Sequence, residues 1–288
     1  KRFILVLRRN WVKVMKKQHK LGVFLEGGGI KTFYGGGVID QLKAFGIKPD
    51  YYAGISASAG TIFGNIFSCS EEIIDIFGKR CDNNKKNFYF FRKPHFPHNH
   101  MMENSLIKIF DKHIKNPNSK SEFKIIAGIT NNNYSWVKTH LVLYLMIMKN
   151  LLRINLFDYF RKMFSVKESS ITSDDNLDKK VIVNFIMGSS SIYPFIKPHY
   201  HDGKLLLEAN CLDLDYQNCL SNCDKGIIIH NSTGKSFVNG KFLHVYSSTS
   251  LPSNILDYTS KEKLVSLRKV GMLEVKKQKF FVEKFISS

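Results

Sequence analysis

The sequence predicts an α/β fold with a mostly parallel sheet that is covered on both faces. Short apolar runs with the character of buried strands alternate with longer segments of helical periodicity. Two turns between a strand and the following helix consist of small residues, Gly27, Gly28 and Gly29 in the first and residues 54–58 in the second. Strands that alternate with helices are typical of such a sheet.

The first half of the chain contains two successive strand, turn and helix units. The apolar run 21–26 predicts a buried strand that leads directly into the three glycines, and residues 32–45 have apolar side chains at helical spacing. Pro49 and Asp50 mark a turn, residues 51–53 a second short strand, and residues 57–68 a second helix. Residues 79–100 are basic, aromatic and rich in asparagine, and their two prolines predict a loop or insertion.

The second half continues the alternation less clearly. Further strands are predicted at residues 123–129, 205–208, 226–230 and 242–246, and a charged helix at residues 261–286. An apolar run over residues 181–187 leads into Gly188 and three serines. Residues 141–164 are apolar on most faces but contain basic side chains, and their longest apolar run would extend only about 12 Å as a helix, against about 30 Å of hydrocarbon in a bilayer. This segment therefore cannot span a membrane.

Length and composition favour a single domain. The chain has 288 residues, 43% of them apolar and 13% aromatic, which is enough for one large core. No linker separates two halves and no internal repeat is present. We expect one domain over residues 21–288 after a basic leader over residues 1–20, with insertions near residues 79–120 and 141–165.

The charge indicates anionic partners. Lys and Arg number 43 against 24 Asp and Glu, a formal net charge of +19. Phospholipid headgroups and nucleic acid both suit such a surface, and charge alone does not choose between them. A genomic bias toward Lys, Asn and Ile would give the same excess without any partner.

The cysteines and the leader bear on the compartment. Five cysteines at irregular spacing predict no disulfide framework, which favours a reducing compartment. Cys211, Cys219 and Cys223 follow His199 and His201, but the spacing matches no common zinc pattern, so we expect no metal site. The apolar run of the leader, residues 3–7, is too short for a secretory signal, and a cytoplasmic location is expected.

The second small-residue turn has the pattern of a nucleophile elbow. Ser56 lies between a predicted strand and a predicted helix, with Gly54 and Ser58 two residues away on either side. A sharp elbow needs small residues at those positions so that the backbones can pass. The pattern is weak by itself, because a helix that begins at a capping Ser56 would look the same.

The glycine turn strengthens the assignment. Gly27, Gly28 and Gly29, followed by Ile30 and Lys31, allow backbone N–H groups to face an anion, because no Cβ blocks the approach. Such an oxyanion hole stabilises the intermediate that forms when an ester carbonyl is attacked. A dinucleotide-binding turn is the rival interpretation, but the Gly-x-Gly-x-x-Gly spacing and the acidic residue after a second strand are missing.

Three sequence blocks together resemble the patatin-like phospholipases, in particular their bacterial branch. The blocks are residues 25–31 with Tyr34, Gly37 and Val38; residues 53–57 around Ser56; and residues 189–194, which are similar to the stretch preceding the family's acid. The resemblance implies a three-layer α/β/α fold, a Ser-Asp dyad without a catalytic histidine, and hydrolysis of acyl esters in phospholipids or other lipids. It implies no metal or other cofactor, and His199 and His201 are taken as loop or surface residues.

The acid of the dyad has two candidates. Asp202, followed by Gly203, has the family's letters but is also a plausible turn residue. In the family a Gly-Lys pair commonly precedes the final strand, and this register puts Glu208, Ala209 and Asn210 at the acid motif, with Asp213 at the acidic position that often follows. We prefer Glu208, whose other interpretation is a solvated strand end.

Further hypotheses concern activity and partners. Thr32 and Ser58 replace family glycines, so a catalytically weak or inactive lipid-binding protein is the alternative to an active hydrolase. Segment 141–164, the leader and loop 79–100 are expected to form a lid or interfacial surface on anionic membranes, although a core helix followed by an amphipathic one would show the same pattern. Nucleic-acid binding through residues 79–100 ranks last, and no protein activator is identified.

Overall fold

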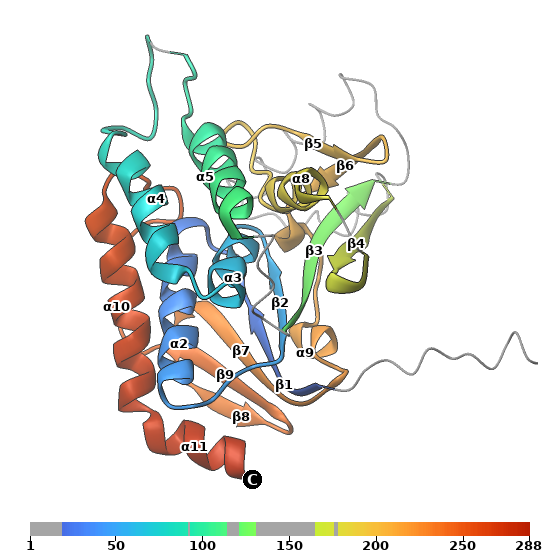
Figure 1. Ribbon diagram of the computed structural model, residues 1–288, viewed down its shortest axis with the longest axis vertical. Coiled ribbons are helices and arrows are strands. Elements are labelled where there is room, and N and C mark those ends of the chain that lie inside the picture. Colours follow the sequence, from blue (N-terminus) through green and yellow to red (C-terminus); the bar gives the residue numbers. More distant parts are fainter. Residues whose placement is uncertain (1–18, 92, 114–120, 131–164, 176–177) are drawn as a thin grey trace, which may run out of the picture.

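The computed structural model describes residues 19–91, 93–113, 121–130, 165–175 and 178–288. Residues 1–18 of the expected leader, residues 114–120 of the first insertion and the whole segment 141–164 lie outside the described residues. The described chain forms one sheet with strand order β5-β6-β3-β2-β1-β7-β9-β8, and β4 pairs with β3 (Figure 1).

The centre of the sheet is parallel, as predicted. The pairs β3–β2, β2–β1, β1–β7 and β7–β9 are parallel, and the antiparallel pairs lie toward the two edges. The parallel strands are β1 (His19–Leu25), β2 (Tyr51–Ile55), β3 (Glu122–Thr130), β7 (Cys223–Thr233) and β9 (Phe242–Ser247). The others are β4 (Val166–Thr172), β5 (His199–His201), β6 (Lys204–Leu207) and β8 (Phe237–Asn239).

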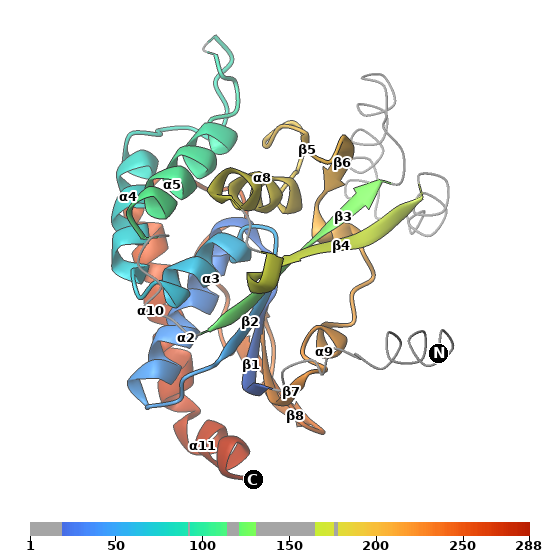
Figure 2. The ribbon, with the colours of Figure 1, turned by 45° about the vertical axis from the view of Figure 1, so that its right-hand side comes forward.

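Helices cover both faces of this sheet (Figures 1 and 2). Most of them lie on one face: α2 (Thr32–Ala44), α3 (Ser58–Ile66), α4 (Ser70–Asp82), α5 (His98–His113), α8 (Lys179–Ser189), α10 (Lys261–Lys277) and α11 (Lys279–Ser287). The other face is covered by the short helices η3 (Ala209–Cys211) and α9 (Tyr216–Cys219). Two further 3-10 helices besides η3, namely η1 (Gly29–Lys31) and η2 (Ser173–Asp175), complete the described elements.

The two cores explain why β1 is apolar without alternation. Val23 and Leu25 point into the large core under the helices, whereas Phe24 points into the smaller core on the opposite face. Phe24 stacks there on Tyr216 of α9, with ring centroids 4.5 Å apart. A strand buried on both faces is therefore a continuous apolar run.

Several elements differ from the sequence expectations. The predicted loop 79–100 is shorter, because α4 extends to Asp82 and α5 begins at His98. Acidic residues in the first turn of α4 and basic ones in its last turn complement the helix dipole. The apolar run 181–187 lies within helix α8, and the C-terminal helix is divided at Gln278 into α10 and α11.

Candidate active site

Ser56 occupies a sharp turn between β2 and α3. Its φ is 56°, in the left-handed region that side-chain-bearing residues seldom adopt, and its side chain is buried. A Cβ at Gly54 would lie 2.3 Å from Ile62 Cδ1 and 2.9 Å from Ser58 Oγ, so a larger residue there would displace both side chains. A strained serine between a strand and a helix is the geometry of a nucleophile elbow.

A hydroxyl from a distant helix holds the backbone of this elbow. Ser189, at the end of α8, accepts a hydrogen bond of 2.8 Å from the Ser56 N–H. Its own hydroxyl donates to the Ile126 carbonyl of β3 at 2.6 Å. The serine stretch therefore connects α8, the neighbouring strand and the elbow.

Ser58 and Thr32, where the resemblance leads us to expect glycine, both have polar partners. The Ser58 hydroxyl accepts from the Ile55 N–H at 3.0 Å and lies 2.8 Å from the Leu25 carbonyl, so it joins the ends of β1 and β2. The Thr32 hydroxyl donates to the Gly29 carbonyl at 2.9 Å and contacts the Thr61 hydroxyl at 3.0 Å. Satisfied hydroxyls of this kind are compatible with an ordered site.

The glycine turn lies directly against the elbow. A Cβ on Gly27 would be 3.0 Å from Ser56 Cβ, so the two segments are in contact. Gly29 has a φ of 54°, and a Cβ there would come within 2.0 Å of the Ile255 carbonyl. Only glycine fits at that position.

The amides of the turn fall into two groups. Ile30 N–H donates to the Ile255 carbonyl at 3.0 Å, and Lys31 N–H donates to the Gly28 carbonyl at 3.1 Å. Within the described residues, the N–H groups of Gly27, Gly28 and Gly29 donate to no protein acceptor. These three remain available to a ligand.

The acid motif 208–210 reaches the same place. Glu208 follows β6, and its side chain is buried. Asn210 donates its amide to Glu208 Oε1 at 2.8 Å, and its Nδ2 would lie 3.0 Å from a Cβ on Gly27. Ser56, Gly27 and the Glu208–Asn210 pair are therefore brought together.

Asp202 lies elsewhere, in the turn between β5 and β6. Its φ is 50°, the following Gly203 also has a positive φ, and the Asp202 side chain is 86% exposed. The Asp-Gly letters are those of a two-residue hairpin turn. His199 and His201 belong to β5, where His199 contacts Asn184 and His201 contacts Asp202.

A small cavity adjoins the nucleophile. Its volume is about 20 Å³, and Ser56, Ala57, His98, Ser190 and Tyr258 are among its lining residues. A second cavity of about 30 Å³ between α3, α4 and α5 shares Gly29, Ala57, Met102 and Tyr258 with it and is mostly apolar. Each has room for roughly one or two water molecules.

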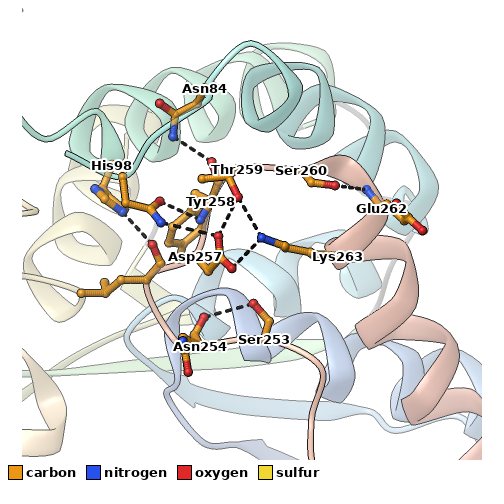
Figure 3. A network of polar contacts seen from close by, with 12 residues as sticks. Asn84, His98, Ser253, Asn254, Asp257, Tyr258, Thr259, Ser260, Glu262 and Lys263 are labelled. Atoms are coloured by element: carbon orange, nitrogen blue, oxygen red, sulfur yellow. Dashed lines mark hydrogen bonds and ion pairs between the residues drawn. The ribbon is translucent and has the colours of Figure 1, made fainter. Parts of the chain in front are cut away.

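A polar network fixes the segment that carries Tyr258 (Figure 3). Asn84 donates to the Tyr258 carbonyl at 2.8 Å, and Lys263 bonds Asp257 at 2.6 Å and Thr259 at 2.9 Å. Burial raises the pKa of Tyr258, so its phenol stays protonated and can donate a hydrogen bond.

Sequence reasoning missed one histidine of this cavity. His98, at the start of α5, is 3% exposed, and its Nε2 donates to the Leu256 carbonyl at 3.0 Å (Figure 3). Its Nδ1 has no partner among the described residues, and burial lowers the pKa of the ring, which favours the neutral form. No local motif marks His98, because it reaches Ser56 only through tertiary packing.

Two further properties concern the described residues as a whole. Their His, Cys, Asp and Glu side chains form no group of three that could ligate a metal ion. None of their helices combines the length and the apolar character needed to cross a bilayer.

Comparisons with known proteins bear on this site. No curated protein matches the sequence significantly. VipD from Legionella pneumophila, a solved structure, is 10% identical with a TM-score of 0.41, and the alignment covers 88% of this chain and 67% of that one. The sequence model of the patatin-like phospholipases matches residues 23–214, which include the glycine turn, Ser56 and the acid motif. The chain therefore belongs to the patatin-like phospholipase family.

Proposed function

We propose that this protein is a lipid acyl hydrolase in which Ser56 is the nucleophile. The observation that carries the proposal is the contact between a positive-φ serine and a turn whose glycine amides have no protein acceptor in the described structure. A nucleophile beside unpaired N–H donors is the arrangement that acyl transfer requires. Membership of the family supports a lipid ester as the substrate.

In the proposed reaction, Ser56 Oγ attacks the ester carbonyl carbon and its proton passes to the Glu208 carboxylate. The carbonyl oxygen becomes an oxyanion that accepts hydrogen bonds from the glycine turn, where one donor contributes about 3–4 kcal/mol. Collapse of the intermediate breaks the ester C–O bond, and the leaving alkoxide takes the proton from Glu208. Water then hydrolyses the acyl-enzyme by the same sequence of steps, with Glu208 as the base.

The choice of Glu208 rests on where the two acids lie. Glu208 is buried and linked through Asn210 to the position of Gly27, which itself contacts Ser56. Asp202 is mostly exposed in a hairpin turn. A base acts only within hydrogen-bond reach, so burial beside the elbow favours Glu208.

Of the five proposed oxyanion-hole residues, the glycines are the stronger candidates. The amides of Ile30 and Lys31 donate to protein carbonyls, whereas those of Gly27, Gly28 and Gly29 do not within the described residues. The cavity beside Ser56 is much smaller than a typical ligand site of about 300–1,000 Å³. Binding of an acyl chain therefore requires side chains such as Met102 or Tyr258 to move.

Serine-directed labelling tests the proposal. A fluorophosphonate should label wild-type protein at Ser56 and leave Ser56→Ala unlabelled, with both proteins giving the same thermal melting profile. Ser105→Ala, which removes a buried hydroxyl bonded only within α5, is the matched control and should label as wild type does. Equal labelling of wild type and Ser56→Ala would reject Ser56 as the nucleophile.

An inactive lipid-binding protein is the second candidate. It is favoured by the hydrogen bond from Asn210 to Glu208, which occupies one carboxylate oxygen, and by the closed cavity. Vesicle binding without labelling and without release of fatty acid would establish this alternative.

A further inference from the structure

Asn231 lies on β7 and contacts the glycine turn and the residue before it, Glu26, with both its side chain and its backbone. Asn231 Nδ2 lies 2.5 Å from the Glu26 carbonyl oxygen and 3.4 Å from the Gly27 carbonyl oxygen. The Asn231 backbone N–H donates to Glu26 Oε2 at 3.1 Å. A Cβ on Gly28 would lie 3.1 Å from Asn231 Cβ, so the side chain packs closely on the turn.

These contacts set the direction of two peptide groups. In a trans peptide the C=O and the N–H of the next residue point in opposite directions. Because Asn231 binds the carbonyls of Glu26 and Gly27, the N–H groups of Gly27 and Gly28 must point away from it. Those are amides without a protein acceptor in the described chain.

The Glu26 carboxylate in turn holds the backbone of Asn231 in place. It accepts from the Asn231 N–H and from the Tyr216 hydroxyl, the latter at 3.3 Å, and His230 Nδ1 lies 3.6 Å away. His230 Nε2 is 3.0 Å from His244 Nδ1. The Glu26 carboxylate, one residue before the glycines, is thus held by hydrogen bonds from Asn231 and Tyr216, and the His230–His244 pair lies next to it.

The side chain of Gln217, next to His244, determines which histidine nitrogen atoms carry protons. Gln217 Nε2, which can only donate, lies 3.4 Å from His244 Nε2, so that nitrogen accepts. His244 Nδ1 then carries the proton and donates to His230 Nε2 at 3.0 Å, and His230 Nδ1 lies on the side of Glu26.

Ring stacking holds the two imidazoles in place. His230 stacks on Tyr246 with centroids 4.1 Å apart, and His244 stacks on Phe237 at 4.4 Å. Burial lowers the pKa of His244, which keeps that ring neutral. A rigid outer shell of this kind is how proteins orient groups that act on a substrate.

We propose that Asn231, backed by Glu26, His230 and His244, is the positioning residue that aims the amides of Gly27 and Gly28 at the carbonyl oxygen of the substrate. The inference rests on the proposed hydrolase function. Asn231 does not touch the substrate and acts through the peptide groups of the turn. Its loss should therefore weaken transition-state stabilisation more than ground-state binding.

Steady-state hydrolysis of 4-nitrophenyl butyrate gives the first measurement. Asn231→Leu keeps the shape of the side chain and removes its donor, and it should lower kcat about tenfold or more while KM changes less than about twofold. Glu26→Gln should lower kcat by a smaller factor, since one acceptor oxygen remains. Asn65→Leu is the control, because Asn65 is also buried but donates only within α3.

Hydrogen–deuterium exchange of peptides covering residues 26–31 gives a second measurement that needs no turnover. The amides of Ile30 and Lys31, which donate to protein carbonyls, should exchange about tenfold faster in Asn231→Leu than in wild type or Asn65→Leu, since the turn opens more often once the side chain of Asn231 no longer holds it. Wild-type kcat together with wild-type exchange in Asn231→Leu would overturn the inference, as would a change confined to KM. If wild type hydrolyses no ester, the proposed function fails, and the exchange comparison still decides whether Asn231 holds the glycine turn in place. If Asn231→Leu does not fold, Glu26→Gln serves in both measurements.

Discussion

The side-chain hydroxyl of Ser189 accepts a 2.8 Å hydrogen bond from the backbone N–H of Ser56, across 133 positions of sequence. Ser56 has a positive φ, and such a conformation persists only where surrounding contacts over-determine it. Ser189 supplies one of these contacts and in turn donates to Ile126. The serine block of the sequence is thereby a structural support for the nucleophile.

Replacing Ser189 by alanine should destabilise the fold and the elbow together. The change leaves the Ser56 N–H and the Ile126 carbonyl without their partner, which costs about 1–3 kcal/mol for a buried group. Urea unfolding of Ser189→Ala should show this loss, and fluorophosphonate labelling should slow. Ser105→Ala removes a buried hydroxyl that bonds only to the Met101 carbonyl and should lose less. Equal losses in the two variants would mean that the bond to Ser56 has no special role.

Separate removal of the two acids distinguishes their roles. Glu208→Gln should lower ester turnover about a hundredfold or more, because the base that takes the serine proton is lost. Asp202→Asn changes an exposed turn residue and should retain most activity. Titration of released fatty acid measures both. An inactive Asp202→Asn beside an active Glu208→Gln would reverse the assignment.

The parallel sheet and the glycine turn could be predicted from the sequence because both are local patterns. β1, β2 and β7 are short apolar runs, and Gly27 and Gly54 stand at fixed distances from Ser56. The contributions of His98 and Asn231 could not be predicted. Each reaches the elbow or the glycine turn through packing between elements distant in sequence, and neither belongs to a motif.

Helices α4 and α5 were not predicted, for a different reason. The basic and aromatic character of residues 79–100 predicts one long loop. In the structure, α4 ends at Asp82 and α5 begins at His98, and both positions lie inside that region. Buried apolar residues in the later turns of α5, such as Leu106 and Phe110, stabilise the helix, and they lie after residue 100. Tertiary packing therefore overrides the local composition.

Ser58 should contribute more to the stability of this chain than a glycine would at the same position. Its hydroxyl joins Ile55 of β2 and Leu25 of β1, and the side chain is fully buried. Ser58→Gly removes these bonds and adds backbone freedom in α3, which should cost about 1–2 kcal/mol of unfolding free energy. Thermal denaturation measures the loss. A variant as stable as wild type and more active would show that Ser58 impairs the site.

Acid should destabilise the fold before the carboxylates titrate. Burial lowers the pKa values of His98, His199 and His244, so these rings stay neutral in the folded protein while the unfolded chain binds protons below a pKa of about 6.5. The stability that they contribute is fully present above that pH and is lost progressively as the pH falls below about 6.5. Urea unfolding at pH 7.5, 6.5 and 5.5 should show this decline.

The variant His98→Gln should reduce that pH dependence. Glutamine can keep a donor to the Leu256 carbonyl but does not titrate, so one of the three contributions disappears. Stability that stays constant from pH 7.5 to 5.5 in wild type would contradict the buried neutral state of these rings.

We expect the loop of residues 83–97, between α4 and α5, to dock on the membrane. This loop projects from the end of the molecule opposite α11 (Figure 1), and the side chains of Phe90 and Phe91 are 72% and 97% exposed. Lys85 and Lys86 lie in the same loop, and each basic residue near an anionic surface adds about 1 kcal/mol of attraction. Asn84 connects the base of the loop to Tyr258, which lines the cavity beside Ser56. Docking of this loop on a bilayer would therefore bring the candidate site to its substrate.

The double variant Phe90→Ser and Phe91→Ser should bind vesicles of phosphatidylglycerol and phosphatidylcholine about tenfold more weakly in co-sedimentation, because two exposed aromatic side chains no longer enter the interface. Lys85→Glu should weaken binding chiefly at low salt, where charges are least screened. The matched control is Phe280→Ser, because Phe280 is also exposed, at 80%, and lies among lysines on α11 at the other end of the molecule. It should bind as wild type does, since a bilayer on α11 would lie far from Tyr258. If Phe280→Ser loses binding and the loop variant does not, the membrane contacts α11 and loop 83–97 has no part in docking.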